Sequence, residues 1–169
     1  MLALILVACG AGQVTQTATQ ARATGGASGR VGSILVRDAQ FVFPGSAAGD
    51  AAYGPGADVP IQVTIVNDAT ATQADGLAPD RLVGVASPIA RSGRIEGAAR
   101  IGDGQVLTAG YADPPAGTKT VGIALVGLTE PVRAGVTYPV VFRFERAGEL
   151  RIELPVETPL NPTPNQENG

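Results

Sequence analysis

The feature that most restricts the fold of this chain is the alternation of apolar residues with polar or small ones. Over residues 61–66, for example, Ile61, Val63 and Ile65 share one face of an extended chain. The same alternation recurs over residues 34–37, 121–125, 140–145 and 150–156. Because successive side chains point to opposite faces of a strand, this period of two predicts antiparallel strands with one face on a core and the other in water.

Turn-forming residues separate these predicted strands. Glycine and proline, often with aspartate, gather at residues 43–45, 54–56, 75–76, 103–104, 113–117 and 147–148. Helical periodicity of useful length is not found. Several short strands joined by such turns indicate an all-β sandwich or barrel. We expect a single domain of this kind over residues 31–157.

The chain begins with a short apolar segment that ends at its one cysteine. Residues 2–8 are too few to span a bilayer, which needs about 20 apolar residues. The tetrad Leu6-Val7-Ala8-Cys9 matches the lipobox of bacterial lipoproteins, in which the cysteine sulfur receives diacylglycerol. Two or three acyl chains, at about 0.8 kcal/mol per buried methylene, give a durable anchor. We therefore predict that residues 1–9 are a signal segment with its lipobox, and that Cys9 is lipidated.

Two features of the N-terminal region bear on this interpretation. Only Met1 precedes the apolar run, whereas a secretory signal opens with basic residues, so we expect the signal to be truncated and its true start to lie upstream. The alternative is a buried strand over residues 2–8 with Cys9 as a core thiol. Residues 10–30 favour the lipobox, because their Gln, Thr, Ala, Gly and Ser content is typical of a flexible tether.

The composition excludes several classes of function. The chain has no His, one Cys and one Met among 169 residues, which leaves no base for Ser-His-Asp or Cys-His catalysis. Ser87, Ser92 and Thr108 offer hydroxyls, but Lys119 is the only candidate base and no motif supports a Ser–Lys dyad. We therefore expect no enzymatic activity. A net charge of −3 predicts no nucleic-acid partner, and the polar residues 158–169 are expected to be a disordered tail.

Three segments, in order, resemble the PCuAC family of periplasmic copper chaperones. They are Asp80-Arg81-Leu82-Val83-Gly84-Val85-Ala86-Ser87-Pro88-Ile89-Ala90, then Gly127-Leu128-Thr129-Glu130-Pro131-Val132-Arg133-Ala134-Gly135, then Phe144-Glu145-Arg146-Ala147-Gly148-Glu149-Leu150 running into residues 154–156. The resemblance implies a cupredoxin-like Greek-key β-sandwich. The front end, Cys9-Gly10-Ala11-Gly12-Gln13-Val14-Thr15-Gln16-Thr17-Ala18, is similar to that of actinobacterial LpqE-type lipoproteins, a group from which no established activity carries over.

The PCuAC resemblance also implies a copper site, which this chain does not reproduce. The family's His-x-Met pair falls on Gly122 and Ala124, its earlier His near Gly97 or Ala98, and its earlier Met near Leu107. Thioether and imidazole donors suit Cu(I), whereas glycine, alanine and leucine side chains offer no donor atom. Residues 10–169 contain no His, Met or Cys. We therefore expect no metal and no cofactor.

Other polar clusters have two possible interpretations each. Asp68, Asp75 and Asp80 could hold a cation, but their spacing matches no calcium loop and a solvated loop is favoured. A second cluster could bind an anionic ligand, although a solvated strand face is favoured for it; its members are Arg91, Arg94 and Arg100, with Glu96 between them.

The remaining aromatic residues could line a groove for a partner or an acyl chain, or they could belong to the core, which is favoured. They are Phe41, Phe43, Tyr53, Tyr111 and Tyr138. We expect an exported lipoprotein on the extracytoplasmic face of the cell membrane. Its domain would bind an envelope protein or a small apolar ligand. The alternative is a copper-handling protein that binds copper only with ligands from a partner.

Overall fold

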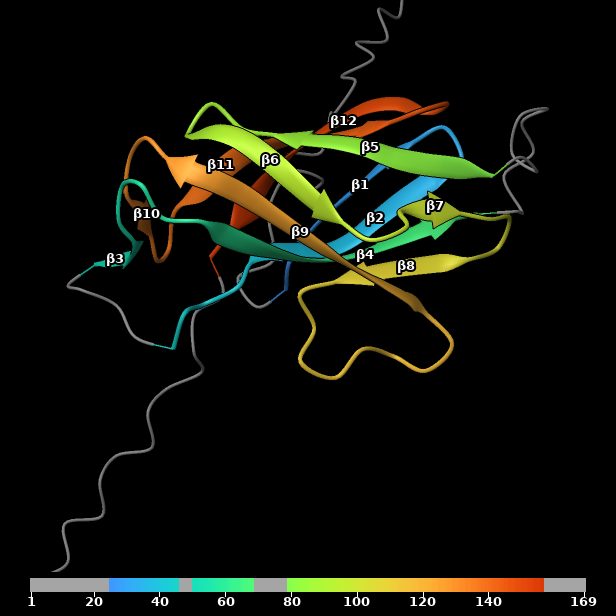
Figure 1. Ribbon diagram of the computed structural model, residues 1–169, viewed down its shortest axis with the longest axis horizontal. Coiled ribbons are helices and arrows are strands. Elements are labelled where there is room, and N and C mark those ends of the chain that lie inside the picture. Colours follow the sequence, from blue (N-terminus) through green and yellow to red (C-terminus); the bar gives the residue numbers. More distant parts are fainter. Residues whose placement is uncertain (1–24, 46–49, 69–78, 157–169) are drawn as a thin grey trace, which may run out of the picture.

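The computed structural model describes residues 25–45, 50–68 and 79–156 (Figure 1). These residues form strands and connecting segments, and none of them lies in a helix that could cross a bilayer. In chain order the strands are β1 (Ala27–Val31), β2 (Ile34–Phe41), β3 (Ala51–Tyr53), β4 (Val59–Asn67), β5 (Asp80–Ala86), β6 (Ala90–Glu96), β7 (Arg100–Ile101), β8 (Val106–Ala109), β9 (Lys119–Leu128), β10 (Val132–Arg133), β11 (Thr137–Phe144) and β12 (Gly148–Pro155).

The strands form two main sheets that pack against each other (Figure 1). The six-stranded sheet has the order β1-β2-β4-β8-β9-β6, and the four-stranded sheet has the order β12-β11-β5-β7. A short ribbon of β10 and β3 lies at one end. One hydrophobic cluster fills the space between the sheets, and its largest fully buried members include Phe41, Ile61, Leu125 and Phe142. The predicted all-β sandwich is confirmed.

The alternation of apolar and polar residues along the strands explains why the two sheets pack face to face. In β4, Ile61, Val63 and Ile65 are fully buried while the residues between them are only partly covered. β11 repeats the pattern with Val140, Phe142 and Phe144. Each of these two strands therefore removes one apolar row from water, and such burial is the dominant favourable term in folding.

The predicted boundary between the tether and the folded domain was wrong, because strand β1 begins before residue 31. Residues 27–30 were expected to belong to a flexible segment, but they are the larger part of a strand that pairs with β2. Large apolar residues are scarce here because β1 packs closely against β12: a Cβ on Gly29 would lie 2.9 Å from the Cγ2 of Ile152. Residues 1–9, the predicted tether before residue 25 and the tail from 158 onward lie outside the described residues.

The pairing of β8 with β9 also departs from the expected antiparallel arrangement. These two strands run parallel, with Leu107 opposite Lys119 and Ala109 opposite Val121. The connection between them carries the predicted turn at residues 113–117 and crosses to the start of β9. A strand with one buried face shows the same alternation of apolar residues whether its neighbour runs parallel or antiparallel. The sequence pattern therefore could not distinguish parallel from antiparallel pairing.

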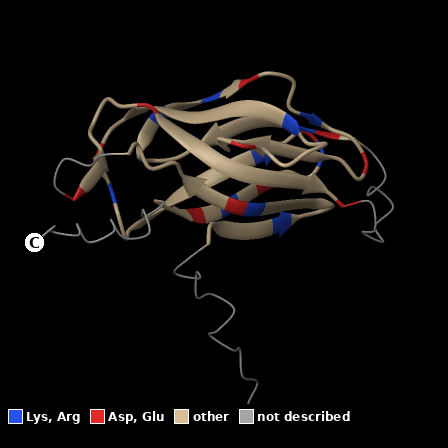
Figure 2. Cartoon of the chain, turned by 90° about the horizontal axis from the view of Figure 1, so that it is seen from below, with Lys and Arg blue, Asp and Glu red and all other residues tan. Residues whose placement is uncertain are grey.

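β5 and β6, one from each main sheet, approach each other closely at Gly93. A Cβ built on Gly93 would lie 1.9 Å from the carbonyl oxygen of Val85, so only glycine fits at this position. Along the chain, the positions of Lys and Arg are interspersed with those of Asp and Glu (Figure 2).

Candidate functional site

The positions that correspond to the family's His-x-Met pair alternate along β9 with the core residues Val121 and Ile123, and the second of them, Ala124, is buried. Gly122 is exposed and lies opposite Glu96 of β6, and a Cβ on it would be 3.3 Å from a carboxylate oxygen of that residue. Ala124 lies opposite both Arg94 and Pro60. Neither position provides a side chain that could coordinate copper.

The two earlier ligand positions are not assembled into a site either. Gly97 lies in the connection between β6 and β7, where a Cβ would face a methyl group of Val121 at 3.5 Å. Leu107 lies on β8 with only 1% of its surface exposed, so its side chain is part of the core. Within the described ranges, His, Cys, Asp and Glu form no group of three or more that could hold a metal ion. The donor set of this chain therefore does not fit copper.

The three aspartates considered as a cation site do not act together. Asp68 forms an ion pair with Arg30, with 2.7 Å between Oδ2 and the guanidinium nitrogen. Asp75 lies outside the described residues. Asp80 is buried, and its carboxylate accepts hydrogen bonds from the backbone N–H groups of Arg146 at 3.0 Å and Ala147 at 2.9 Å. Asp80 therefore stabilises the turn between β11 and β12.

The three arginines considered as a cluster also separate. Arg94 pairs with Asp58 at 3.1 Å and with Glu96 at 2.9 Å, so its charge is satisfied on the surface of β6. The side chain of Arg91 lies along Gly127. Arg100 belongs to β7 in the other sheet, where it meets different neighbours.

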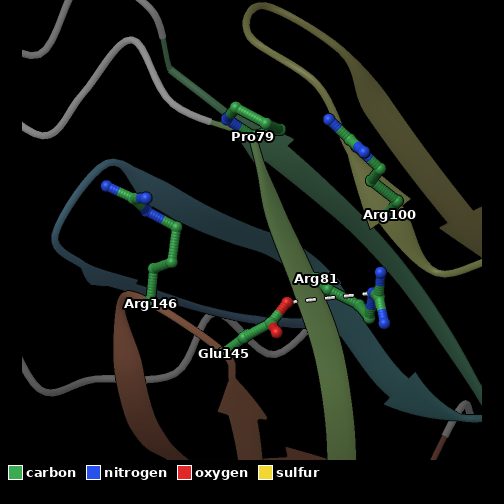
Figure 3. A pocket seen from close by; sticks show the side chains of 5 residues that line it. All are labelled: Pro79, Arg81, Arg100, Glu145 and Arg146. Atoms are coloured by element: carbon green, nitrogen blue, oxygen red, sulfur yellow. Dashed lines mark ion pairs between the residues drawn. The ribbon is translucent and has the colours of Figure 1, made fainter.

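Arg100 lines an open depression that we call the arginine pocket (Figure 3). It has a volume of about 320 Å³, and its other lining residues are Pro79, Arg81, Glu145 and Arg146. The side chains of Arg100 and Arg146 lie on opposite sides of the view, and Glu145 points toward Arg81. The Nε of Arg81 and the Oε2 of Glu145 are 3.8 Å apart.

The sequence analysis named Arg100 as a possible anion-binding residue but missed the other residues of the arginine pocket, because they come from distant parts of the chain. Arg81 and Arg100 meet through the register of β5 with β7, in which they are opposite each other. Arg146 arrives through the hairpin of β11 and β12. The short strand β7 has only two residues, so alternation gave no signal for it.

Two of the hydroxyl groups considered above, those of Ser87 and Thr108, have structural partners. Thr108 is fully buried, and its Oγ1 donates to the carbonyl oxygen of Lys119 at 3.2 Å. The amine of Lys119 instead donates to the carbonyl oxygen of Arg100 at 3.3 Å. Ser87 donates to the carbonyl oxygen of Pro139 at 2.6 Å. These contacts connect neighbouring strands and loops.

The aromatic residues mostly pack in or beside the core. Phe41 is fully buried and lies 6.2 Å from the ring of Tyr138, in a tilted arrangement. The Tyr138 hydroxyl accepts from the N–H of Arg133 at 2.9 Å. Tyr53 donates its hydroxyl to the carbonyl oxygen of Val42 at 2.6 Å, and burial raises the pKa of its phenol above the usual 10.0. Tyr111 forms a hydrogen bond of 2.8 Å with Thr64.

Solved structures share this fold. The chain superposes on the copper-bound PCuAC domain from PmoF2 with a TM-score of 0.56 and 23% identity, over 79% of this chain and 99% of that one. The apo PCuAC domain from PmoF1 gives a TM-score of 0.58 and 21% identity, over 79% and 100%. At this level of identity the likeness concerns the fold, which is of the PCuAC type.

Sequence comparisons identify the family. "Putative lipoprotein LpqE" of Mycobacterium tuberculosis (strain ATCC 25618 / H37Rv) is 31% identical over 95% of this chain and 86% of its own length. The protein of that description from Mycobacterium leprae (strain TN) is 29% identical over 96% and 86%. The sequence profile described as "Putative lipoprotein LpqE-like" matches residues 34–156. The chain therefore belongs to the LpqE-like lipoprotein family, on a β-sandwich of the PCuAC type.

Proposed function

We propose that the domain is a metal-independent binding module of the cell envelope. The observation that carries this proposal is the chemistry at the positions of the family's copper ligands. Gly122 and Ala124 have no donor atoms, and Leu107 is turned into the core. The sandwich itself depends only on its buried apolar rows, so it persists without a metal.

The module is held at the membrane by a lipid on Cys9. The lipobox tetrad ending at Cys9 supports this part of the proposal, as do relatives described as lipoproteins. An acylated Cys9 places the domain on the extracytoplasmic face of the membrane. The partner class is an envelope protein or a small ligand.

A Cu(I) titration tests the loss of metal binding. The full chain with Cys9→Ser, which removes the one thiol, is titrated with Cu(I) in the presence of a competing chelator. We expect the chelator to keep the metal at one equivalent, because soft donors are missing from residues 25–156. The PCuAC domain from PmoF2, described as copper-bound, is the positive control. Competitive binding of one equivalent by this chain would overturn the proposal.

The alternative function is copper handling with ligands supplied by a partner. The shared fold with a copper-bound PCuAC domain favours it. The same titration distinguishes the two when a peptide containing a His-x-Met pair is added. Tight copper binding by the mixture, beyond that of the peptide alone, would favour the alternative.

A further inference from the structure

We propose that the arginine pocket binds a phosphate group, either free in solution or on a lipid headgroup. This inference rests on the proposed binding function and deepens it by naming the chemical class of ligand. The pocket combines Arg81, Arg100 and Arg146 with a single carboxylate at its surface, that of Glu145. Phosphate suits several guanidinium groups at once, because it offers more oxygens than a carboxylate and the forked N–H donors of arginine match those oxygens.

The first argument is the direct opposition of two like charges. Arg81 of β5 and Arg100 of β7 are partners in the strand register, so both cations project from adjacent backbone positions. Like charges directly opposite each other across two strands are destabilising. An anion bound between them removes this repulsion, so the arrangement favours a ligand of negative charge.

The second argument is the shortage of internal counter-charges. In the part of the chain that the structure describes, Arg100 and Arg146 have no carboxylate within ion-pair distance. Arg81 has Glu145 at 3.8 Å, near the limit of such a contact. Arg94 and Arg143, by contrast, have carboxylate oxygens at 2.9 Å. The cations of the pocket are thus available to an external anion.

The third argument is that a buried residue fixes the backbone around the pocket. One carboxylate oxygen of Asp80 accepts from the N–H of Arg81 at 2.7 Å and from that of Arg146 at 3.0 Å. The N–H of Glu145 donates to the carbonyl oxygen of Arg81 at 2.9 Å. The backbone positions of two arginines are therefore set before any ligand arrives, which lowers the entropic cost of binding.

The balance of charge around the pocket is positive. The amine of Lys119 donates to the carbonyl oxygen of Arg100 at 3.3 Å, so a further cation lies at the backbone of this arginine. Asp80 opposes them from beneath, but three backbone N–H groups already satisfy its carboxylate. The volume of about 320 Å³ is at the small end of the range for small-molecule sites and accommodates one phosphate group with its solvent.

A pair of charge-matched variants tests the site. The full chain with Cys9→Ser is compared with the same chain carrying Arg100→Gln and Arg146→Gln. The matched control carries Arg37→Gln and Arg91→Gln, which remove the same charge from two exposed arginines that also have no ion pair among the described residues. Backbone amide shifts in NMR are followed during titration with inorganic phosphate, against sodium chloride of equal ionic strength.

We expect phosphate to shift the amides of residues 81, 100 and 146 beyond the effect of chloride. The pocket variant should bind about tenfold more weakly, the loss expected when charge-assisted contacts are removed, and the control within about twofold. Without phosphate the pocket variant should unfold at the same or higher urea concentration, because Arg100→Gln removes the repulsion with Arg81. Equal phosphate affinity of both variants, or no shift at these amides, would overturn the proposal.

Vesicles distinguish the two sources of phosphate. The chain is mixed with vesicles of phosphatidylcholine alone and with vesicles that also contain phosphatidylglycerol. The lipid headgroup is assigned if the chain binds only the second kind, if the pocket variant does not bind them, and if inorganic phosphate competes. Phosphate binding without this vesicle preference would assign a soluble ligand. The Cu(I) titration is independent of both arms, so failure of the phosphate site is distinguishable from failure of the metal-independent module.

Discussion

The carboxylate of Asp80 accepts a hydrogen bond of 2.9 Å from the backbone N–H of Ala147, 67 positions later in the chain. This contact ties the start of β5 to the turn between β11 and β12, and the N–H of Arg146 adds a second bond from the same turn. Asp80 is 4% exposed, so water cannot replace it as an acceptor. One buried side chain therefore holds two neighbouring parts of the smaller sheet together.

Replacing Asp80 should weaken the fold. Asp80→Ala leaves several N–H donors near the turn without their acceptor, and we expect the free energy of unfolding to fall by about 3 kcal/mol. Asp80→Asn keeps one acceptor oxygen and should lose less. Urea unfolding followed by circular dichroism measures both. The control Asp103→Ala changes an exposed aspartate in a turn and should shift the free energy by less than about 0.5 kcal/mol. Equal stability of Asp80→Ala and the control would contradict this role.

Gly93 should be the glycine in a strand interior that is least tolerant of a side chain. Gly93→Ala places a methyl group 1.9 Å from the carbonyl oxygen of Val85, so β5 and β6 must move apart. Gly93 itself is exposed, but the added methyl group would overlap backbone atoms of Val85, so we expect a loss of about 2 kcal/mol or more. Gly84→Ala is the matched control, because the new methyl group would be 3.7 Å from the Cβ of Arg143 and should be neutral or slightly stabilising. Thermal unfolding of the two variants checks this, and similar midpoints would refute the close approach.

The sequence predicted most of the sandwich but not its edges. Rows such as Ile61, Val63 and Ile65 are long enough for alternation to be read, and they form the core. β1 was missed because its small residues satisfy close packing against β12 and leave no apolar signal. The neighbours of Arg100 in the pocket were missed for another reason: its pairing with Arg81 depends on strand register, which composition and spacing do not determine.

Tyr53 should make stability depend on pH in the alkaline range. Its phenol is neutral when folded, and burial raises its pKa above 10.0, so ionisation favours the unfolded chain. The resulting stability is present below the unfolded pKa near 10 and is lost as pH rises through the higher folded pKa. Tyr53→Phe lacks the hydrogen bond to Val42 and should be less stable by about 1 kcal/mol at pH 7.

The test for Tyr53 is how the difference in the free energy of unfolding between wild type and Tyr53→Phe changes with pH. Urea unfolding of wild type and Tyr53→Phe from pH 7 to pH 11 should show the wild type losing its advantage at the alkaline end. Tyr111→Phe serves as the comparison, since it also removes one hydroxyl hydrogen bond, that with Thr64. A constant difference between wild type and Tyr53→Phe across the range would show that Tyr53 does not contribute to the pH dependence.

The lipid anchor is the prediction on which the cellular placement depends, and it rests on one atom. If diacylglycerol is attached to the sulfur of Cys9, a clickable fatty acid fed to producing cells should label the wild type and miss Cys9→Ser. The variant keeps the size of the side chain and changes the nucleophile, so export through the apolar residues 2–8 is least disturbed. Equal labelling of the two proteins would mean that Cys9 is not the acceptor, and the module would then need another route to the membrane.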